Sequence, residues 1–234
     1  MTTVRGVRAR ARIEITAAIK DEARRQLAAE GAAKLSLRAV ARELGMVSSA
    51  LYRYFPSRDE LLTALIIDAY DSVGAAAERA RDTARAAAPG DHLAHWTAVC
   101  RAVRAWAVEH PHEYALIYGS PVPGYAAPKD TIGPASRVGL VLVDLVRAAF
   151  RDRGVAPPPL PEPLRAEAER LAADLAPDLP PALAAALVAG WSQLFGLVSF
   201  EVFGQFDNIV EAREPFFVAA VERLGRDVGL LRKP

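Results

Sequence analysis

The stretch Leu35–Leu62, LSLRAVARELGMVSSALYRYFPSRDELL, carries the clearest structural pattern in the chain. Ser36 stands before an apolar-periodic run and predicts the start of a short helix. Gly45 supplies the backbone freedom for a tight turn, and a second short helix is expected over Ser48–Tyr54. Pro56 should end that helix, because the residue before a proline avoids the α conformation. The pattern predicts a hairpin of two short helices.

A longer helix is expected on each side of this hairpin. Upstream, apolar residues recur at helical spacing over about Arg10–Glu30, and Gly31 provides a stop. Downstream, Ser57 and Glu60 have the spacing of a capping box and predict a long helix to about Ala88. Short helices packed on longer ones form the helix-turn-helix unit, whose second helix enters the DNA major groove.

The two faces of the hairpin differ in chemistry. The inner face is apolar, with Val40, Leu44, Leu51 and Phe55. The outer face carries Arg38, Arg42, Ser48, Ser49, Arg53 and Tyr54, with Glu43 as its acid. Small residues at the tip of the second helix allow close approach to base edges, and hydroxyls can donate or accept there. DNA binding is therefore predicted over the alternative of a hairpin whose polar face is only solvated.

Charge is distributed unevenly along the chain. Residues 1–60 hold 12 Lys/Arg against 7 Asp/Glu, whereas residues 61–234 hold 17 against 21. We expect the N-terminal arginines to form a flexible arm that follows the DNA backbone or a minor groove: Arg5, Arg8, Arg10 and Arg12. The asymmetry indicates a basic interaction surface at the N-terminal end.

The hairpin and its flanks resemble the DNA-binding domain of the TetR (tetracycline repressor) family of bacterial transcriptional regulators. The matching elements are Ser36, Ala41, Leu44-Gly45, Leu51-Tyr52-x-Tyr54-Phe55 and Pro56-Ser57-Arg58-x-Glu60-Leu61. The resemblance implies that Tyr52, Tyr54 and Arg58 bind phosphates, and that Ser48, Ser49 and Ala50 read bases. Ser36 and Arg58 also lie at helix N-termini, which favour anions. The predicted DNA-binding set is Ser36, Arg38, Ser48, Ser49, Ala50, Tyr52, Tyr54 and Arg58.

The remainder of the chain predicts further helices and no convincing strand, so the fold class is all-α. The expected helices are about Asp91–Glu109, His112–Tyr118, Pro134–Arg153, Leu164–Leu175, Pro181–Phe206 and Val210–Leu230. We predict an N-terminal three-helix DNA-binding domain over residues 1–60. Residues 61–234 are predicted to form a helical domain, and the TetR resemblance implies that this domain binds a small molecule and dimerises.

The segment Leu179–Phe200 has no charged residue in 22 positions, which is long enough to span a bilayer. It is rich in alanine, contains Ser192 and Gln193, and has no nearby basic anchor, so a buried or interface helix is favoured over a membrane span. Leu187, Trp191, Leu194 and Val198 are expected to form one stripe, while Gly190, Gly196 and Ala189 would permit the close approach of a neighbour. The resemblance implies a homodimer through the last two long helices, and Trp191 with Gly196 resembles the Trp-x-x-x-x-Gly element of a TetR subgroup.

Aromatic residues and one thiol in the larger domain are candidates for an effector pocket, because small-molecule cavities combine aromatic walls with few polar groups. The alternative for each is an ordinary place in the core. The candidates are Trp96, Cys100, Trp106, Tyr114, Tyr118, Trp191 and Phe195. A small, mostly apolar effector is expected.

Other chemistry is not favoured. His92 and His95 have metal-ligand spacing, but a third ligand is missing and the pair is expected in an exposed first turn, so no metal and no cofactor are predicted. Cys100 lacks an orienting partner for nucleophilic catalysis. As the single cysteine, it excludes an internal disulfide and fits a reducing cytoplasm.

These patterns together predict a cytoplasmic, homodimeric DNA-binding regulator. Its expected partners are a palindromic operator in double-stranded DNA and a small effector, with repression the favoured mode and no membrane. The alternatives are a helical-bundle enzyme or a scaffold protein with an incidental helix-turn-helix. The enzyme would need a charged cluster in its C-terminal cavity, which the sequence does not indicate.

Overall fold

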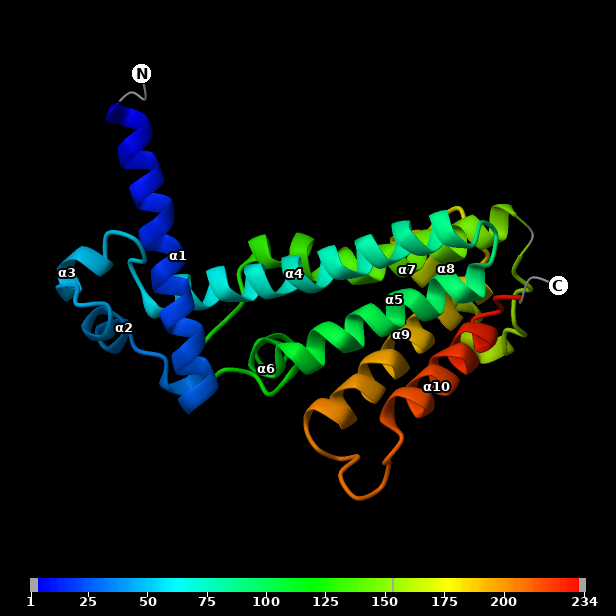
Figure 1. Cartoon of the computed structure of the whole chain (residues 1–234). Helices are drawn as coiled ribbons and strands as arrows, with labels where there is room; N and C mark the ends of the chain where they lie inside the picture. The colour runs from blue at the N-terminus through cyan, green and yellow to red at the C-terminus, as the bar shows by residue number, and fades with distance from the viewer. Residues whose placement is uncertain (1–3, 153, 232–234) are drawn as a thin grey trace. The chain divides into compact units, whose positions relative to one another are not determined.

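The computed structural model describes residues 4–152 and 154–231, with side chains from residue 7, and in this part the chain is all-α (Figure 1). Ten α-helices and three short 3-10 turns are present among the described residues, without a strand. One isolated antiparallel bridge pairs Val155 with Leu230. The predicted fold class is confirmed.

The helices have the following bounds: α1 Val4–Glu30, α2 Leu37–Glu43, α3 Ser48–Leu51, α4 Arg58–Ala87, α5 His92–Glu109, α6 Pro111–Tyr118, α7 Ile132–Arg151, α8 Arg165–Leu175, α9 Pro181–Val202 and α10 Arg213–Asp227. The 3-10 turns are η1 Ala32–Lys34, η2 Lys129–Thr131 and η3 Glu162–Leu164.

Several predicted helix ends are confirmed by their caps. The Oγ of Ser57 accepts a hydrogen bond from the Glu60 N–H at 3.1 Å at the start of α4. Asp91 accepts from the Ala94 N–H at 3.0 Å at the start of α5. Both contacts satisfy N–H groups that the first turn of a helix leaves without an intrahelical partner.

Other predicted bounds are wrong. α1 begins at Val4 rather than near Arg10, so residues expected in a flexible arm are helical. α9 ends at Val202 rather than Phe206, because Gly204 adopts a φ of 79°, which cannot continue a helix. α10 begins at Arg213 rather than at residue 210.

The chain forms two compact units. Unit 1 contains the described residues up to Tyr70 together with His110–Pro134, and unit 2 contains Asp71–Glu109 and the described residues from Ala135 onward. The predicted division at residue 60 contained no second segment, whereas unit 1 extends to Tyr70 and also includes His110–Pro134. The second segment joins unit 1 because α6 and the loop after it pack on the N-terminal core, a long-range contact that local sequence patterns do not report.

Unit 2 is built around α5, with α9 and α10 packed against it and against each other, and α8 packed on α9. Figure 1 shows α9 and α10 side by side. Trp96 lies at the centre with no exposed surface, and its indole N–H donates to the carbonyl of Val221 on α10 at 2.9 Å. Gly225 permits this approach, since a Cβ there would lie 3.0 Å from the Trp96 ring.

α9 is the one described helix that is long and apolar enough to cross a membrane, by length and composition only. Of its most apolar window, 39% is buried inside the protein. Leu187, Leu194 and Val198 of the predicted stripe are buried against the chain's own helices, whereas Trp191 is 41% exposed. The stripe is thus mainly core of unit 2, with Trp191 left at the surface.

Candidate nucleic-acid interface

The hairpin in unit 1 forms as local sequence signals predict. The Oγ of Ser36 accepts a hydrogen bond from the Ala39 N–H at 3.4 Å and caps α2. Gly45 adopts a φ of 62°, a conformation that L side chains rarely take, and the next N–H, from Met46, donates to the carbonyl of Ala41 at 2.8 Å. The left-handed backbone of Gly45 therefore ends α2, and the hydrogen bond from Met46 to Ala41 closes the turn.

The second helix of the hairpin is shorter than predicted. α3 spans Ser48–Leu51, and residues 52–54 follow as turns. The Tyr54 N–H donates to the carbonyl of Leu51 at 2.8 Å, an i to i+3 bond that tightens the end of the helix. The serines that open α3 keep their predicted place at its first turn.

A small apolar core holds the hairpin in place. Val40, Ala41 and Leu51 are 0–1% exposed, and Phe55 is 7% exposed. Leu44, which was also expected on this face, is only partly buried. The core is completed by buried residues of α1 and α4: Ile19, Ala23, Leu27, Leu61, Leu62 and Leu65. The hairpin is thereby fixed on two longer helices.

The opposite face of the hairpin is open to solvent. Arg38 on α2 and Ser48 and Ser49 on α3 are exposed, and Ala50 is partly exposed. Tyr52 is 42% exposed. The α3 tip carries two hydroxyls and a methyl, and Arg38 and Tyr52 add an exposed guanidinium and an exposed phenol from the same hairpin, which are groups suited to base edges and to phosphates. These residues lie on one continuous local element, as the sequence predicts.

Tyr54 has a partner within unit 1. The guanidinium carbon of Arg12 lies 5.3 Å from the centre of the Tyr54 ring, within the range of a cation–π contact. Arg8, Arg10 and Arg12 are exposed on helix α1, so the prediction of a flexible arm is wrong for them. The Arg5 side chain lies outside the described side chains.

Arg58 makes internal hydrogen bonds at the start of α4. Its Nε donates to the carbonyl of Leu35 at 3.2 Å, and its Nη2 donates to the carbonyls of Ala32 and Ala33 at 2.9 and 3.2 Å. These carbonyls belong to the segment that leads into α2. Arg58 therefore ties α4 to that segment, while the predicted phosphate contact remains a prediction.

The loop after α6 belongs to the same unit, which the sequence did not predict. The hydroxyls of Tyr125 and of Thr63 on α4 are 2.8 Å apart. Val122 and Leu116 also pack on the core beneath the hairpin. The only local signal is the Pro- and Gly-rich composition of residues 119–131, which predicts a loop but not its packing partner.

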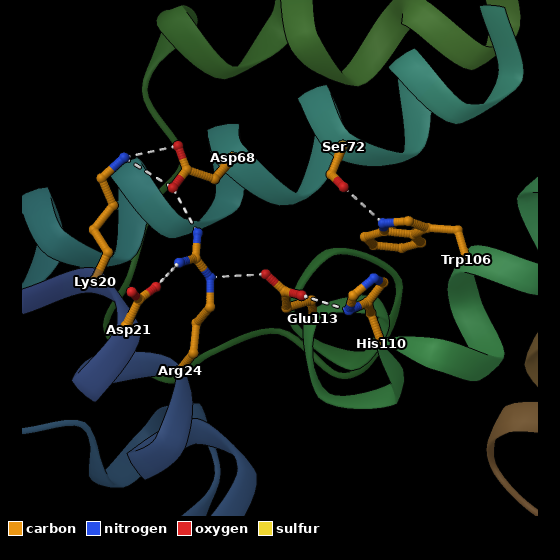
Figure 2. Close-up of polar contacts among 8 residues, drawn as sticks. All are labelled: Lys20, Asp21, Arg24, Asp68, Ser72, Trp106, His110 and Glu113. Carbon is orange, nitrogen blue, oxygen red and sulfur yellow. Dashed lines mark hydrogen bonds and ion pairs between the residues drawn. The ribbon is translucent and has the colours of Figure 1, made fainter. Parts of the chain in front are cut away.

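A partly buried ion network joins α1, α4 and α6 within unit 1 (Figure 2). Arg24 contacts Glu113 at 2.9 Å and Asp68 at 2.7 Å, and Lys20 contacts Asp68 at 2.8 Å. Burial disfavours the charged guanidinium, but the carboxylates of Glu113 and Asp68 together raise the pKa of Arg24 above its ordinary value. His110 adds a contact of 3.3 Å to Glu113. Local sequence patterns give no signal for these ion pairs, because Arg24–Glu113 and Lys20–Asp68 join residues far apart in sequence.

Three of the predicted effector residues are core residues of unit 2. Trp96 and Cys100 have no exposed surface, and Trp106 is 5% exposed. The indole N–H of Trp106 donates to the hydroxyl of Ser72 at 2.9 Å, as Figure 2 shows. Burial raises the pKa of the Cys100 thiol well above its ordinary value, so the thiol stays protonated and unreactive.

The other four candidates are divided between the units. Tyr114 and Tyr118 lie in unit 1, where their rings are 5.1 Å apart and Tyr70 packs edge-on against Tyr118 at 5.9 Å. Burial, with smaller contributions from Tyr70 and Tyr114, raises the pKa of Tyr118. Trp191 and Phe195 lie on α9 of unit 2, with ring centres 5.8 Å apart. The seven candidates therefore do not form one site within either unit.

The histidine pair differs from expectation. His92 and His95 are 4% and 2% exposed, so the prediction of an exposed first turn is wrong. His95 Nε2 lies 2.8 Å from the carbonyl of Ala88, and His92 Nε2 lies 3.1 Å from a carboxylate oxygen of Asp152. Burial lowers the pKa of His92, although the Asp152 carboxylate opposes the shift. Among the described residues, no group of three His, Cys, Asp or Glu side chains could hold a metal ion.

Two short helices joined by a turn at Gly45, with an exposed polar tip and two longer helices behind them, are the features of helix-turn-helix DNA-binding proteins. Comparison with known proteins agrees. Residues 19–65 match the family described as "Bacterial regulatory proteins, tetR family", and residues 96–224 match "Tetracyclin repressor-like, C-terminal domain".

Relatives and solved structures match over most of the chain. The chain is 44% identical over 204 residues to HTH-type transcriptional regulator Rv1816 of Mycobacterium tuberculosis, covering 86% of each protein. The crystal structure of regulatory protein SCO4313 is similar with a TM-score of 0.76 and 37% identity, covering 92% of this chain and 97% of that one. The TetR family transcriptional regulator PfmR of Thermus thermophilus shares the fold, with a TM-score of 0.58, 19% identity and coverage of 92% and 99%.

The chain belongs to the TetR family. It is a helix-turn-helix DNA-binding transcriptional regulator of a non-enzymatic family.

Proposed function

We propose that the chain is a homodimeric repressor that leaves a palindromic operator when it binds a small, mostly apolar effector. The observation that carries the DNA-binding part is the exposed tip of α3, with Ser48 and Ser49 open to solvent above the buried Leu51. A small-residue tip can approach base edges closely, so these serines and Ala50 are the proposed base readers.

The proposed phosphate contacts come from other residues of the hairpin and from Arg58 at the start of α4. Tyr52 has an exposed ring with a terminal hydroxyl, and Arg38 is exposed on α2. Ser36, Tyr54 and Arg58 are partly exposed, and each already has an internal contact, so their share of phosphate binding is proposed to be smaller. Phosphate contacts position the protein, whereas base contacts supply specificity.

Dimerisation is proposed through α9 and α10. The outer side of this helix pair exposes large apolar residues: Phe200 at 52%, Phe203 at 41% and Phe216 at 43%. Gly196, Phe200 and Phe216 line a groove of about 610 Å³ there. A two-fold pair would present two α3 helices to half-sites about 34 Å, or a multiple of it, apart on DNA.

The response to effector is proposed as a two-state shift. α4 is helical from Arg58 to Ala87 and contributes residues to both units, which supports transmission without a flexible linker. An effector acts as a switch only if it binds the DNA-released state more tightly than the DNA-bound state. A cytoplasmic location follows from the proposed DNA partner.

Gel-shift titration at several salt concentrations tests the division of roles on the hairpin. We expect affinity to fall steeply with salt, since each neutralised phosphate releases counterions. Tyr52→Phe should weaken binding by a similar factor on all sequences, whereas Ser49→Ala should change the preferred bases. Equal effects of both substitutions on every sequence would contradict the division.

Sedimentation tests the proposed dimer. Phe200→Glu places a charge on the α9–α10 face and should shift the protein to monomer. Val108→Glu is the matched control, because Val108 is 50% exposed on α5 of the same unit. A dimer that survives Phe200→Glu and dissociates with Val108→Glu would move the interface to another face.

A further inference from the structure

Unit 2 carries a second apolar groove, formed by α7, α8 and α9, with a volume of about 340 Å³. Its walls include Gly139 and Leu140 of α7, Leu171 and Leu175 of α8, and Leu187 and Trp191 of α9. Large apolar side chains stand at its mouth, with Leu140 54% exposed, Leu175 46% and Trp191 41%. These three side chains lie together around one hollow instead of singly on the surface.

The groove is suited to an uncharged ligand. The described residues that line it include no charged side chain, and Ser136 supplies the one aliphatic hydroxyl. A charged ligand would lose hydration there without gaining an ionic partner. The Trp191 indole offers a flat apolar ring for stacking. The volume lies at the lower end of small-molecule pockets, about the size for a ligand of one or two rings.

The groove lies on a different side of α9 from the proposed dimer face. Trp191 and Phe200 are nine residues apart, and at about 100° per residue they project from nearly opposite sides of the helix. A second copy seated on the α9–α10 face would therefore leave this groove open. The Trp191 and Gly196 pair contributes one residue to each groove.

The wall of the groove is directly connected to α4 within unit 2. Arg137, next to the groove residue Ser136, donates from Nη2 to Glu78 at 2.7 Å and from Nη1 to Asp71 at 2.7 Å. Gly74 allows α4 to approach closely, since a Cβ there would lie 2.7 Å from the Cβ of Arg137. A displacement of α7 by a bound molecule would thus act on α4 through this arginine.

We propose that the groove between α7, α8 and α9 is the effector site, and that it takes an uncharged aromatic molecule of one or two rings. Arg137 is the positioning residue that passes the occupied state from α7 to α4. This inference rests on the proposed repressor function, and it places the effector at the side of the bundle instead of around the buried Trp96 and Cys100.

Calorimetric titration with phenol, indole and 1-naphthol tests the site, with 1-naphthalenesulfonate as the charged counterpart of the naphthol. The blocking variant is Gly139→Leu, because nothing lies within 4 Å of a Cβ at Gly139 and the added side chain can fill the groove. The matched control is Ala173→Leu, which adds the same bulk to an exposed position of α8. Thermal melting of each variant establishes that it is folded.

We expect the 234-residue protein to bind at least one uncharged aromatic at least tenfold more tightly than the sulfonate. Gly139→Leu should weaken that binding at least tenfold, and Ala173→Leu should stay within twofold of the original. The bound aromatic should lower operator affinity at least threefold, and Arg137→Met should abolish this effect while the aromatic still binds.

Four results would overturn the proposal: no binding by the three aromatics, equal binding by folded Gly139→Leu, binding without any change in operator affinity, or loss of the dimer in Gly139→Leu. The last result would assign the groove to a second copy of the chain. Operator binding by the ligand-free protein is measured in parallel. Its absence would instead contradict the proposed function, so the two failures are distinguishable.

Discussion

The α2–α3 hairpin of unit 1 and helix α9 of unit 2 are both apolar segments, but they differ in how much of their environment the sequence specifies. The hairpin has one apolar face, which is buried, and one polar face, which is exposed. α9 is apolar around most of its circumference: Leu194 and Val198 are fully buried, while Trp191 and Phe200 are 41% and 52% exposed. A one-faced segment determines its own orientation, whereas α9 is oriented by the helices packed on it.

The difference has a functional counterpart. The hairpin's exposed face is polar and suits a charged, hydrogen-bonding partner such as DNA. The two exposed sides of α9 are apolar and suit a second protein surface and an uncharged small molecule. Substitutions in the two regions should therefore produce separable losses.

The largest separable effect is expected from cavities in the two cores. Leu51→Ala and Leu194→Ala each remove a fully buried side chain and should cost about 2–5 kcal/mol of unfolding free energy. Leu51→Ala should abolish operator binding, because α3 loses its anchor. Chemical denaturation and gel shifts measure both quantities. If Leu194→Ala abolished operator binding while Leu51→Ala retained it, the hairpin and α9 would not have separate roles.

A smaller loss is expected from the ion network of Figure 2. Arg24→Met leaves Asp68 and Glu113 without their shared guanidinium and should lower the free energy of unfolding of unit 1 by about 1–3 kcal/mol. Arg42→Met is the control in the same unit, since Arg42 and its partner Glu43 are 77% and 54% exposed and their pair should contribute no more than about 1 kcal/mol. Urea denaturation checks this order. Equal losses for the two variants would show that the network adds nothing beyond surface pairing.

Substitution of Arg58 can separate its observed internal hydrogen bonds from its predicted phosphate contact. Arg58→Gln removes hydrogen bonds to three carbonyls and should cost about 1–2 kcal/mol of stability. If those bonds are its main role, the salt dependence of operator binding should stay unchanged. Arg38→Gln, at an exposed position, should instead reduce the salt slope by about 1. Unchanged stability with a reduced slope for Arg58→Gln would favour the phosphate role.

The smallest effect is expected from pH and lies in unit 2. Because burial lowers the pKa of His92, the unfolded chain binds this proton more readily than the folded chain. The free energy of unfolding should fall as the pH drops below about 6.5, by less than about 1.4 kcal/mol per pH unit for one group. His92→Gln should remove this part of the slope, and His112→Gln, at an exposed position, should keep it. Denaturation at about pH 5.5–7.5, around the ordinary histidine pKa, measures it, and an unchanged slope in His92→Gln would contradict the assignment.

The sequence predicted local structure correctly but did not predict contacts between distant segments. The Ser36 cap, the Gly45 turn and the Ser57 cap depend on neighbours within a few residues and were predicted correctly. The attachment of Tyr125 to Thr63 and of Glu113 to Arg24 joins residues far apart in sequence, where propensity and spacing carry no information.

The effector candidates illustrate the same limit. An aromatic residue on a helical stripe gives the same sequence pattern whether it fills the core or lines a pocket. Trp96 is fully buried and hydrogen-bonded to Val221, whereas Trp191 lines a groove at the surface. The groove itself depends on how α7, α8 and α9 come together, so no single segment predicts it.

Selection and sequencing of genomic DNA retained by the original 234-residue protein, compared with DNA retained by Ser49→Ala, tests the role of the hairpin tip most directly. We expect the original protein to enrich one palindrome, and Ser49→Ala to enrich a palindrome with the same spacing but changed bases within each half-site. The contradicting result is that the original protein enriches no common sequence, or that both proteins enrich an identical one.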